Sequence, residues 1–476
     1  MIKRIKLIVT PLALAMALAG CMSLAPKYER PQAPVAGSFP EVPRAASAPA
    51  NAAATEAPAA IEWQRFFADA RLKQLIGQAL ANNRDLRIAI ANIEQARAQY
   101  RIQRADRLPS VGAAITGQRQ TTGEDQPIES VYQAGLTVSA FELDLFGRVR
   151  NLSEAALAQY LATEEARKTA QISLISSVAN AYLQLLADEE LLSLAQRTVQ
   201  TREESDKLTQ LRFENGVSSR LEVQQSRSLV ETARTTLAQA QRQRAQDINL
   251  LTLLVGQPIP ENPAGATLAS TELPDLPAGL PSDLLASRPD IRAAEQQLIA
   301  ANANIGAARA NFFPRITLTG SVGSASTELS GLFKSGSYGW TFAPQAILPI
   351  FDYGRNTAVL GSARAQRDVA VAQYERSIQT AFREVADALA GQATFSEQLR
   401  AQRAVAEAEA DRFNLSDLRY RNGAASYLDL LDAQRSLFQA QQLAIQANLL
   451  RLQNQVTLYR VLGGGWTEAA TPVAAR

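Results

Sequence analysis

Four segments of the chain alternate apolar and polar residues with a period of two, the pattern of β-strands that have two different faces. They form two pairs: SVGAAITGQ at 110–118 with VYQAGLTVSAFEL at 131–143, and RITLTGSVG at 315–323 with YGWTFAPQAILPI at 338–350. Each is about the 9–11 residues that a tilted transmembrane strand requires. The pattern therefore predicts two membrane hairpins, with soluble hairpins wetted on one face as the alternative.

Very long helical stretches follow each strand pair. Residues 148–215 contain neither Gly nor Pro, and residues 355–422 are Pro-free with two glycines. A helix of that length would extend roughly 100 Å. Each stretch ends in Asn-Gly, at Asn215–Gly216 and Asn422–Gly423, and a further helical segment follows, at 217–255 and 424–462. Asn and Gly tolerate the left-handed conformation, so each pair predicts a tight turn between two antiparallel helices.

The second half of the chain repeats the first. NRDLRIAIANIEQARAQYRIQRADRLPSV at 83–111 aligns with RPDIRAAEQQLIAANANIGAARANFFPRI at 288–316, and LDLFGR at 143–148 aligns with IFDYGR at 350–355. The turn sequences RFENGVSSRLEVQQSR and RYRNGAASYLDLLDAQ recur in register. We therefore interpret the chain as an internal duplication of one unit, a strand pair followed by a long helical hairpin.

The N-terminus has the features of an export signal. Three basic residues precede a 14-residue apolar run that ends in LAGC, and Cys21 is the only cysteine. The run is too short to span a bilayer and typical of a signal peptide. The pattern resembles a bacterial lipoprotein signal, with residues 1–20 removed and Cys21 carrying lipid; an ordinary signal peptide is the alternative. Residues 22–60 are rich in Pro, Ala and Ser, which predicts an extended tether.

Composition excludes several kinds of chemistry. There is no His, so Ser-His and Cys-His catalysis and His-metal sites are impossible, and a single Cys cannot form a thiolate cluster. We predict no catalytic residues, no metal and no cofactor other than the lipid on Cys21. The formal charge of +2 falls to −1 without residues 1–20, so nothing indicates nucleic acid as a partner.

Four strands per chain cannot close a barrel. An open edge in lipid would leave backbone groups unpaired, so membrane strands require several chains. Two chains give eight strands and three give twelve. The helices have apolar faces diluted by Ala, Ser, Thr and Gln, which suits a ring with a wet lumen, and a wet lumen favours the larger barrel. We therefore expect three copies.

These motifs resemble the TolC-type outer-membrane factor family. The likeness rests on ELDLFGRVR, LPIFDYGR, RPDIRAAE, ANIGAARANFFPRI, the final LGGG and the lipoprotein start, and it extends from about residue 60 to 465. More narrowly, the chain resembles NodT-like acylated channels of tripartite resistance-nodulation-division (RND) efflux pumps. The resemblance implies a mainly α-helical protomer with membrane β-strands. Three protomers would form a 12-stranded outer-membrane β-barrel, continuous with a long periplasmic α-helical barrel and a mixed equatorial domain.

On this basis the chain divides into ten segments. They are a signal peptide (1–20), an acylated tether (21–62), first-repeat helices (63–107), a first β-hairpin (108–147), a first helical hairpin (148–256), an equatorial Pro-rich linker (257–285), a second-repeat helix (286–313), a second β-hairpin (314–353), a second helical hairpin (354–463) and a C-terminal tail (464–476).

The resemblance also implies a gate. Asp429 and Asp432 lie three residues apart on one helix face, where spacing alone is equally typical of an acid pair that complements the helix dipole. The family places an aspartate pair there at the periplasmic pore constriction, and Tyr420 and Glu222 match a tyrosine-to-acid link that holds the closed tip. An arginine that assists this link is replaced by Ala425, so Arg421 or Arg220 is the expected substitute.

The implied function is passive export, without enzymatic activity. The expected partners are two further copies, a periplasmic membrane-fusion adaptor, an inner-membrane RND transporter and outer-membrane lipid; the cargo would be drugs and other small toxic compounds. Three alternatives remain: an exit channel for metals or polypeptides, a periplasmic coiled-coil adaptor or scaffold lipoprotein, and hydrolysis by carboxylates alone.

Overall fold

The computed structural model describes residues 23–39, 61–121, 127–259, 267–276 and 281–466. The predicted signal peptide and Cys21 therefore lie outside the described residues. The chain forms two compact units, one of residues 1–33, 91–165 and 292–377 and the other of residues 34–90, 166–291 and 378–476. Each unit contains parts of both sequence repeats, so the units do not correspond to the repeats.

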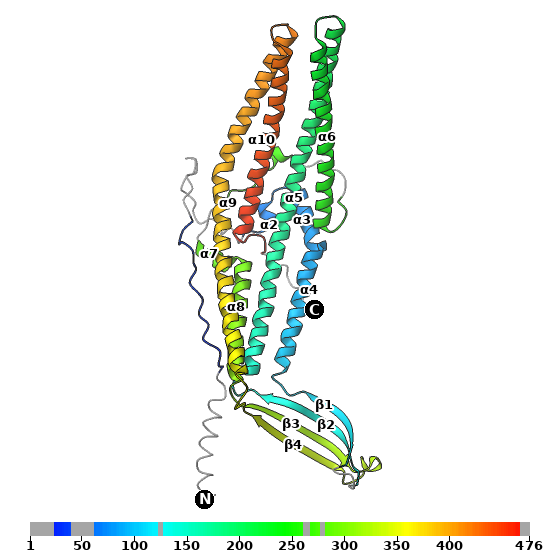
Figure 1. Ribbon diagram of the computed structural model, residues 1–476, viewed down its shortest axis with the longest axis vertical. Helices are drawn as coiled ribbons and strands as arrows, with labels where there is room; N and C mark the ends of the chain where they lie inside the picture. Colours follow the sequence, from blue (N-terminus) through cyan, green and yellow to red (C-terminus); the bar gives the residue numbers. More distant parts are fainter. Residues whose placement is uncertain (1–22, 40–60, 122–126, 260–266, 277–280, 467–476) are drawn as a thin grey trace. The chain divides into compact units, whose positions relative to one another are not determined.

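The described residues contain the elements labelled in Figure 1. The helices are α2 Trp63–Phe66, α3 Ala70–Asn82, α4 Arg84–Ala105, α5 Arg148–Glu214, α6 Arg220–Val255, α7 Pro281–Ser287, α8 Pro289–Ala310, α9 Arg355–Arg421 and α10 Tyr427–Val461. The strands are β1 Val111–Gln120, β2 Glu129–Leu143, β3 Arg315–Ser326 and β4 Tyr338–Ile347. The helices α5 and α9 each contain 67 residues. No helix among the described residues is long and apolar enough to cross a membrane.

One predicted helix is broken. The segment 286–313 contains the end of α7 and then α8, separated by Arg288. Pro289 is the first residue of α8, and a proline disfavours the helical conformation in the residue before it. The Arg288 guanidinium contacts Asp290 at 2.6 Å and Glu384 at 2.9 Å, and donates to the Val461 carbonyl at 3.0 Å. The break thus anchors the start of α8.

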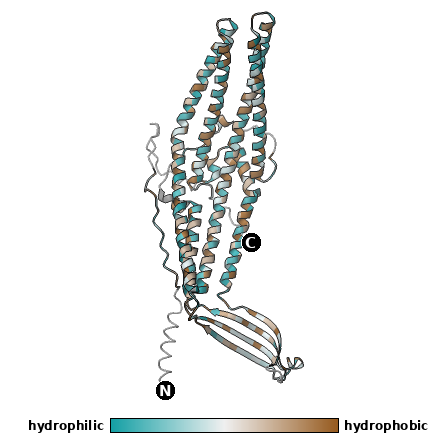
Figure 2. Ribbon diagram, in the orientation of Figure 1, coloured by the Kyte–Doolittle hydropathy of each residue, from teal (hydrophilic) through white to brown (hydrophobic). Residues whose placement is uncertain are grey.

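The four strands form one antiparallel sheet in the order β1-β2-β3-β4. Paired residues share a face, and one face is apolar across the sheet: Val111 pairs with Val138, Leu136 with Val322, and Val322 with Trp340. Val138 is half-buried and the other large side chains are exposed; Trp340, for example, is 70% accessible. Figure 2 shows the resulting alternation of hydrophobic and hydrophilic bands along the strands. The sheet therefore presents a broad apolar face that the single chain does not cover.

A β-bulge keeps this face continuous. The register between β2 and β3 shifts after Val138, and Ala140 adopts a φ of 48°. Beyond the bulge, Phe141 pairs with Leu318. Without the extra residue, the apolar side chains at the end of β2 would point to the opposite face.

Residues of the ELDLFGRVR motif in the first repeat and of the FFPRI motif in the second repeat meet where the sheet joins its helices. Glu142 at the end of β2 contacts Arg148 at 2.6 Å and Arg315 at 2.7 Å, and its side chain is only 10% exposed. The Phe146 and Phe313 rings stack with centroids 4.6 Å apart. A buried carboxylate held by two guanidinium groups fixes the directions in which the strands leave the helices.

The first described segment lies along α8 rather than hanging free. Asn302 donates to the Pro26 carbonyl at 2.7 Å, Arg309 donates to the Leu24 carbonyl at 2.9 Å, and Arg30 pairs with Glu295 at 2.7 Å. These residues form neither helix nor strand, and side chains of α8 satisfy two of their carbonyl groups.

Two acids are buried together between α5 and α6. Asp188 and Asp247 are each 5% exposed. Gln184 donates to Asp188 at 2.9 Å and Gln243 donates to Asp247 at 3.1 Å. Burial, and next the neighbouring Asp188 carboxyl, raise the pKa of Asp247 to about 7. The pair therefore retains a proton at pH values where exposed aspartates are ionised.

We expect this pair to make stability depend on pH. Because the folded pKa of Asp247 is raised, stability is lost as the pH rises from about 4, the unfolded value, to about 7. Asp247→Asn should remove most of that loss and raise Tm at pH 8, by roughly 2 °C per kcal/mol. Thermal unfolding in non-ionic detergent from pH 5 to 8 measures this. The exposed Asp368→Asn is the control, and an equal pH slope in wild type and Asp247→Asn would contradict the expectation.

Candidate gate at the hairpin tips

The two helical hairpins end in turns of the same geometry. Gly216 and Gly423 have φ values of 73° and 72°, in the left-handed region that glycine occupies without strain. The next residue closes each turn: Val217 N donates to the Arg212 carbonyl and Ala424 N to the Arg419 carbonyl, each at 2.8 Å.

The Asn side chains complete the turns. Asn215 and Asn422 donate to the carbonyls of Leu211 and Leu418 at 2.7 and 2.8 Å. The four turn residues singled out from the sequence therefore perform equivalent tasks in the two repeats.

Asp429 begins the returning helix by capping it. Its carboxylate accepts from Ser426 N at 3.1 Å and from the Ser426 hydroxyl at 2.8 Å, while Ser426 accepts from Asp429 N at 3.2 Å. This is a capping box. The hydrogen bonds from Ser426, and then the positive charge of Arg419, lower the pKa of Asp429 below its ordinary value. The carboxylate is exposed and ionised near neutral pH.

Asp432 is the second exposed carboxylate of this helix. Its Oδ2 lies 3.0 Å from Arg412 Nη1, and its side chain is 64% exposed. Arg412 lies on α9, where it also contacts Glu409 at 2.7 Å, so its contact with Asp432 links α9 to α10. Asp429 and Asp432 thus share the solvent-facing side of α10 as the spacing predicted, but each has its own partner within the chain.

Tyr420 and Glu222 are not joined in this structure. Glu222 accepts from the Ser218 hydroxyl, and Glu222 N donates to Ser219. The Tyr420 hydroxyl is buried and has no hydrogen-bond partner within the described residues. Instead, the Arg212 guanidinium lies over the Tyr420 ring at 4.7 Å and donates to the Tyr420 carbonyl at 3.4 Å. The contact between the hairpins at Tyr420 is therefore a cation–π contact in this structure.

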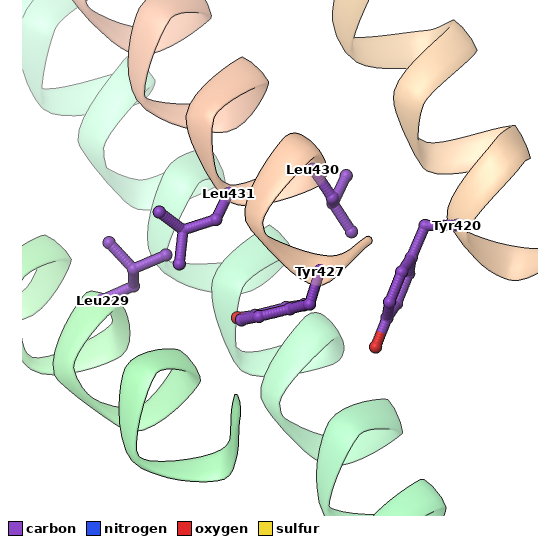
Figure 3. Packing of buried hydrophobic residues seen from close by; sticks show 5 residues of the cluster. All are labelled: Leu229, Tyr420, Tyr427, Leu430 and Leu431. Carbon is purple, nitrogen blue, oxygen red and sulfur yellow. The ribbon is translucent and has the colours of Figure 1, made fainter. Parts of the chain in front are cut away.

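An apolar cluster stabilises the tip. Figure 3 shows Leu229 from α6, Tyr420 from α9, and Tyr427, Leu430 and Leu431 from α10. Each is at most 4% exposed, and the two tyrosine rings lie 5.6 Å apart. The cluster joins the two hairpins, so the tip is held by apolar packing as well as by charges.

The sequence did not identify the arginines that act here. Arg421, one expected substitute for the arginine missing at Ala425, pairs with Asp417 at 2.8 Å. Arg212 and Arg412 form the contacts at Tyr420 and Asp432 instead. The partner of Arg212 is 208 residues away in the chain, and only the packing of helices brings them together. Arg412 could have been found by its three-residue spacing from Glu409.

Comparison with known proteins agrees with this architecture. The model of the family described as outer membrane efflux protein matches residues 75–257 and 280–464, one match for each repeat. The chain belongs to the outer membrane efflux protein family. It is therefore an outer-membrane protein of an efflux system, and its mainly helical fold with four antiparallel strands is that of the family.

Individual relatives cover nearly the whole chain. The antibiotic efflux pump outer membrane protein ArpC and the toluene efflux pump outer membrane protein TtgC, both of Pseudomonas putida, are each 51% identical over 95% of this chain and 94% of their own. The open-state MtrE outer membrane channel of Neisseria gonorrhoeae superposes with a TM-score of 0.84 at 42% identity, over 94% of this chain and 99% of that chain.

The tip contains no arrangement for metal chemistry. Within the part of the chain that the structure describes, no group of three or more Asp, Glu or Cys residues is placed to hold a metal ion. What the tip offers is a set of charged and apolar contacts between two hairpins, which can hold them together or release them.

We expect Tyr420→Ala to loosen the tip selectively. Loss of the buried ring should cost roughly 3 kcal/mol, because it removes packing against Tyr427 and the contact with Arg212. Hydrogen exchange of amides at 220–231 and 427–433 should then become about 100-fold faster where local opening governs exchange. Leu428→Ala, in the first turn of α10 beside Tyr427 but 63% exposed, is the matched control. Unchanged exchange in Tyr420→Ala would show that the cluster does not hold the hairpins.

Proposed function

We propose that three copies of this chain assemble into a closed channel for efflux across the outer membrane. The observation that carries the proposal is the sheet, with its exposed apolar face and with β1 and β4 each paired on one side only within the described strands. In lipid, such edges leave backbone N–H and C=O groups unpaired at several kcal/mol each. Pairing β4 of one copy with β1 of the next satisfies them, and three copies close a 12-stranded barrel.

The helices then form the periplasmic part of the channel. Each copy supplies two long hairpins, α5–α6 and α9–α10, so three copies supply six. Their surfaces mix hydrophobic and hydrophilic residues along the whole length, as Figure 2 shows. Such surfaces suit helices that pack on both sides while one face lines a wet lumen. Cys21, as a lipidated first residue, would add an anchor.

The cargo we propose is small organic compounds, including solvents and antibiotics. The support comes from relatives named for toluene and antibiotic efflux. A passive channel requires an energy source elsewhere, so we propose a periplasmic membrane-fusion adaptor and an inner-membrane RND transporter as partners. The chain itself would conduct without catalysing a reaction.

The gate we propose is the tip of α9–α10. In a threefold assembly, Asp429 and Asp432 would gather six carboxylates near the axis and attract cations while repelling anions. Arg412 and Ser426 hold these carboxylates in place in the single chain. Opening would break contacts between hairpins, such as the one between Arg212 and Tyr420.

The assembly is tested by the mass and conductance of the purified protein. Native mass spectrometry from detergent should give three chains, and planar bilayers should show discrete channels. Release from outer membranes by salt alone, without detergent, would instead support a periplasmic scaffold. Two-chain particles would contradict the threefold channel.

The acid ring is tested by ion selectivity. Asp429→Asn with Asp432→Asn should move the reversal potential in a KCl gradient toward that of an unselective pore. We choose Asn because it can still accept the capping hydrogen bond at position 429. Glu214→Gln, at the end of the first hairpin, is the control. Unchanged cation selectivity in the double variant would place the constriction elsewhere.

A further inference from the structure

A cavity of about 310 Å³ lies between the two hairpins, next to the apolar cluster of the tip. It is lined by α5 on one side and α10 on the other, with Phe413 of α9 beside them. Its ten lining residues include two arginines, Arg197 and Arg202, and no Asp or Glu. The cavity is therefore positively charged, and no acid among its lining residues balances the charge.

Arg202 is the unusual member of this lining. The residue is only 6% exposed. Its Nη1 donates to the Leu229 carbonyl at 3.1 Å, and its guanidinium lies 5.6 Å from the centre of the Phe438 ring. Its Nε is buried without a hydrogen-bond partner within the described residues. A neutral carbonyl and an aromatic face stabilise this cation, but one donor remains unsatisfied.

Burying a guanidinium in this way is costly. A buried charge ordinarily has an opposite charge beside it, and an unsatisfied buried donor carries its full desolvation penalty. Burial, together with repulsion from Arg435, lowers the pKa of Arg202 below its ordinary value. The surroundings therefore disfavour the cation, and an anion in the cavity would remove the penalty.

Other arginines of this chain show which partner fits the edge of a guanidinium group formed by Nε and Nη2. Arg30 uses Nε and Nη2 together to hold both oxygens of Glu295, at 2.7 and 2.8 Å. Arg148 does the same with Glu142, at 2.8 and 2.6 Å. In Arg202, Nη1 is occupied and Nε is not. This edge matches the two oxygens of a carboxylate, and because the Arg202 Nε is enclosed by protein, a carboxylate in the cavity accepts from Nη2.

The remaining lining selects for an apolar body behind the carboxylate. Leu194, Leu437, Phe438 and Phe413 supply hydrocarbon surface. The hydroxyls of Thr198 and Thr201 donate to carbonyls of their own helix, which leaves the arginines as the strong donors to a ligand. The volume lies at the small end of the range for ligand pockets.

We propose that this cavity is a binding site for small amphiphilic carboxylates, with Arg202 holding the carboxylate and Leu437 and Phe438 contacting the hydrocarbon chain. The site borders the apolar cluster of the tip, because Phe413 packs against that cluster and Leu229 accepts from Arg202, but neither Asp429 nor Asp432 lines it. A bound ligand would contact α5 and α10 at once and so join the first hairpin to the second.

Binding of decanoate to the full chain in maltoside detergent, measured by calorimetry below the micelle concentration of decanoate, tests the proposal. Decanol, which has the same chain without the charge, is the matched ligand and should bind at least tenfold more weakly. Arg202→Gln should weaken decanoate binding roughly 10- to 100-fold. Arg400→Gln, an exposed arginine of α9 outside the cavity, should have no effect.

A second variant covers the case in which Arg202→Gln perturbs folding. Leu437→Trp fills the cavity while retaining Arg202, and should also abolish decanoate binding without changing thermal unfolding in the absence of ligand. Equal binding of decanoate and decanol, or undiminished binding to either variant, overturns the proposal. Absence of decanoate binding to wild type also overturns the proposal, and if Arg202→Gln then alters the number of chains in the particle, a carboxylate of a neighbouring copy is the partner of Arg202.

Discussion

The constraint on which this protein depends is the hydrogen bonding of a sheet with two open edges. Four strands carry a continuous apolar face, yet β1 and β4 each pair on one side only within the described strands. Lipid supplies no donors or acceptors, so the strands are stable there only when copies pair edge to edge. The β-bulge at Ala140 keeps the apolar face continuous, because it leaves Phe141 on the face that Val322 and Leu136 occupy.

The duplication gives the two hairpins the same backbone but different chemistry. Gly216 and Gly423 have nearly the same φ, and the same carbonyls are satisfied in both turns. Past the turn the repeats diverge. In the first, Glu222 bonds Ser218; in the second, Asp429 closes a capping box and Asp432 reaches across to Arg412. Backbone geometry is therefore shared by the two repeats, and the exposed pair Asp429 and Asp432 is confined to the second repeat.

The features that could be predicted from the sequence were those that depend on neighbouring residues. Alternation placed the four strands and Asn-Gly placed the turns, because strand period and left-handed φ depend on neighbouring residues. Pairings between distant helices could not be predicted in this way. The family resemblance implied a link between Tyr420 and Glu222, and within the single chain Tyr420 contacts Arg212, since helix rotation and register decide which side chains meet. The break at Arg288 was missed although Pro289 signalled it.

Helix geometry also explains why two buried ionisable groups of α5, Asp188 and Arg202, do not pair with each other. Asp188 shares burial with Asp247, and Arg202 is buried as a cation, so a direct ion pair would satisfy both. They are 14 residues apart on one helix, which separates them by about 21 Å. At that distance opposite charges attract by less than about 1 kcal/mol even at a dielectric constant near 20. A straight helix cannot shorten the gap, so each group is stabilised locally. The acid pair retains a proton, and the arginine has a cavity that an anion can enter.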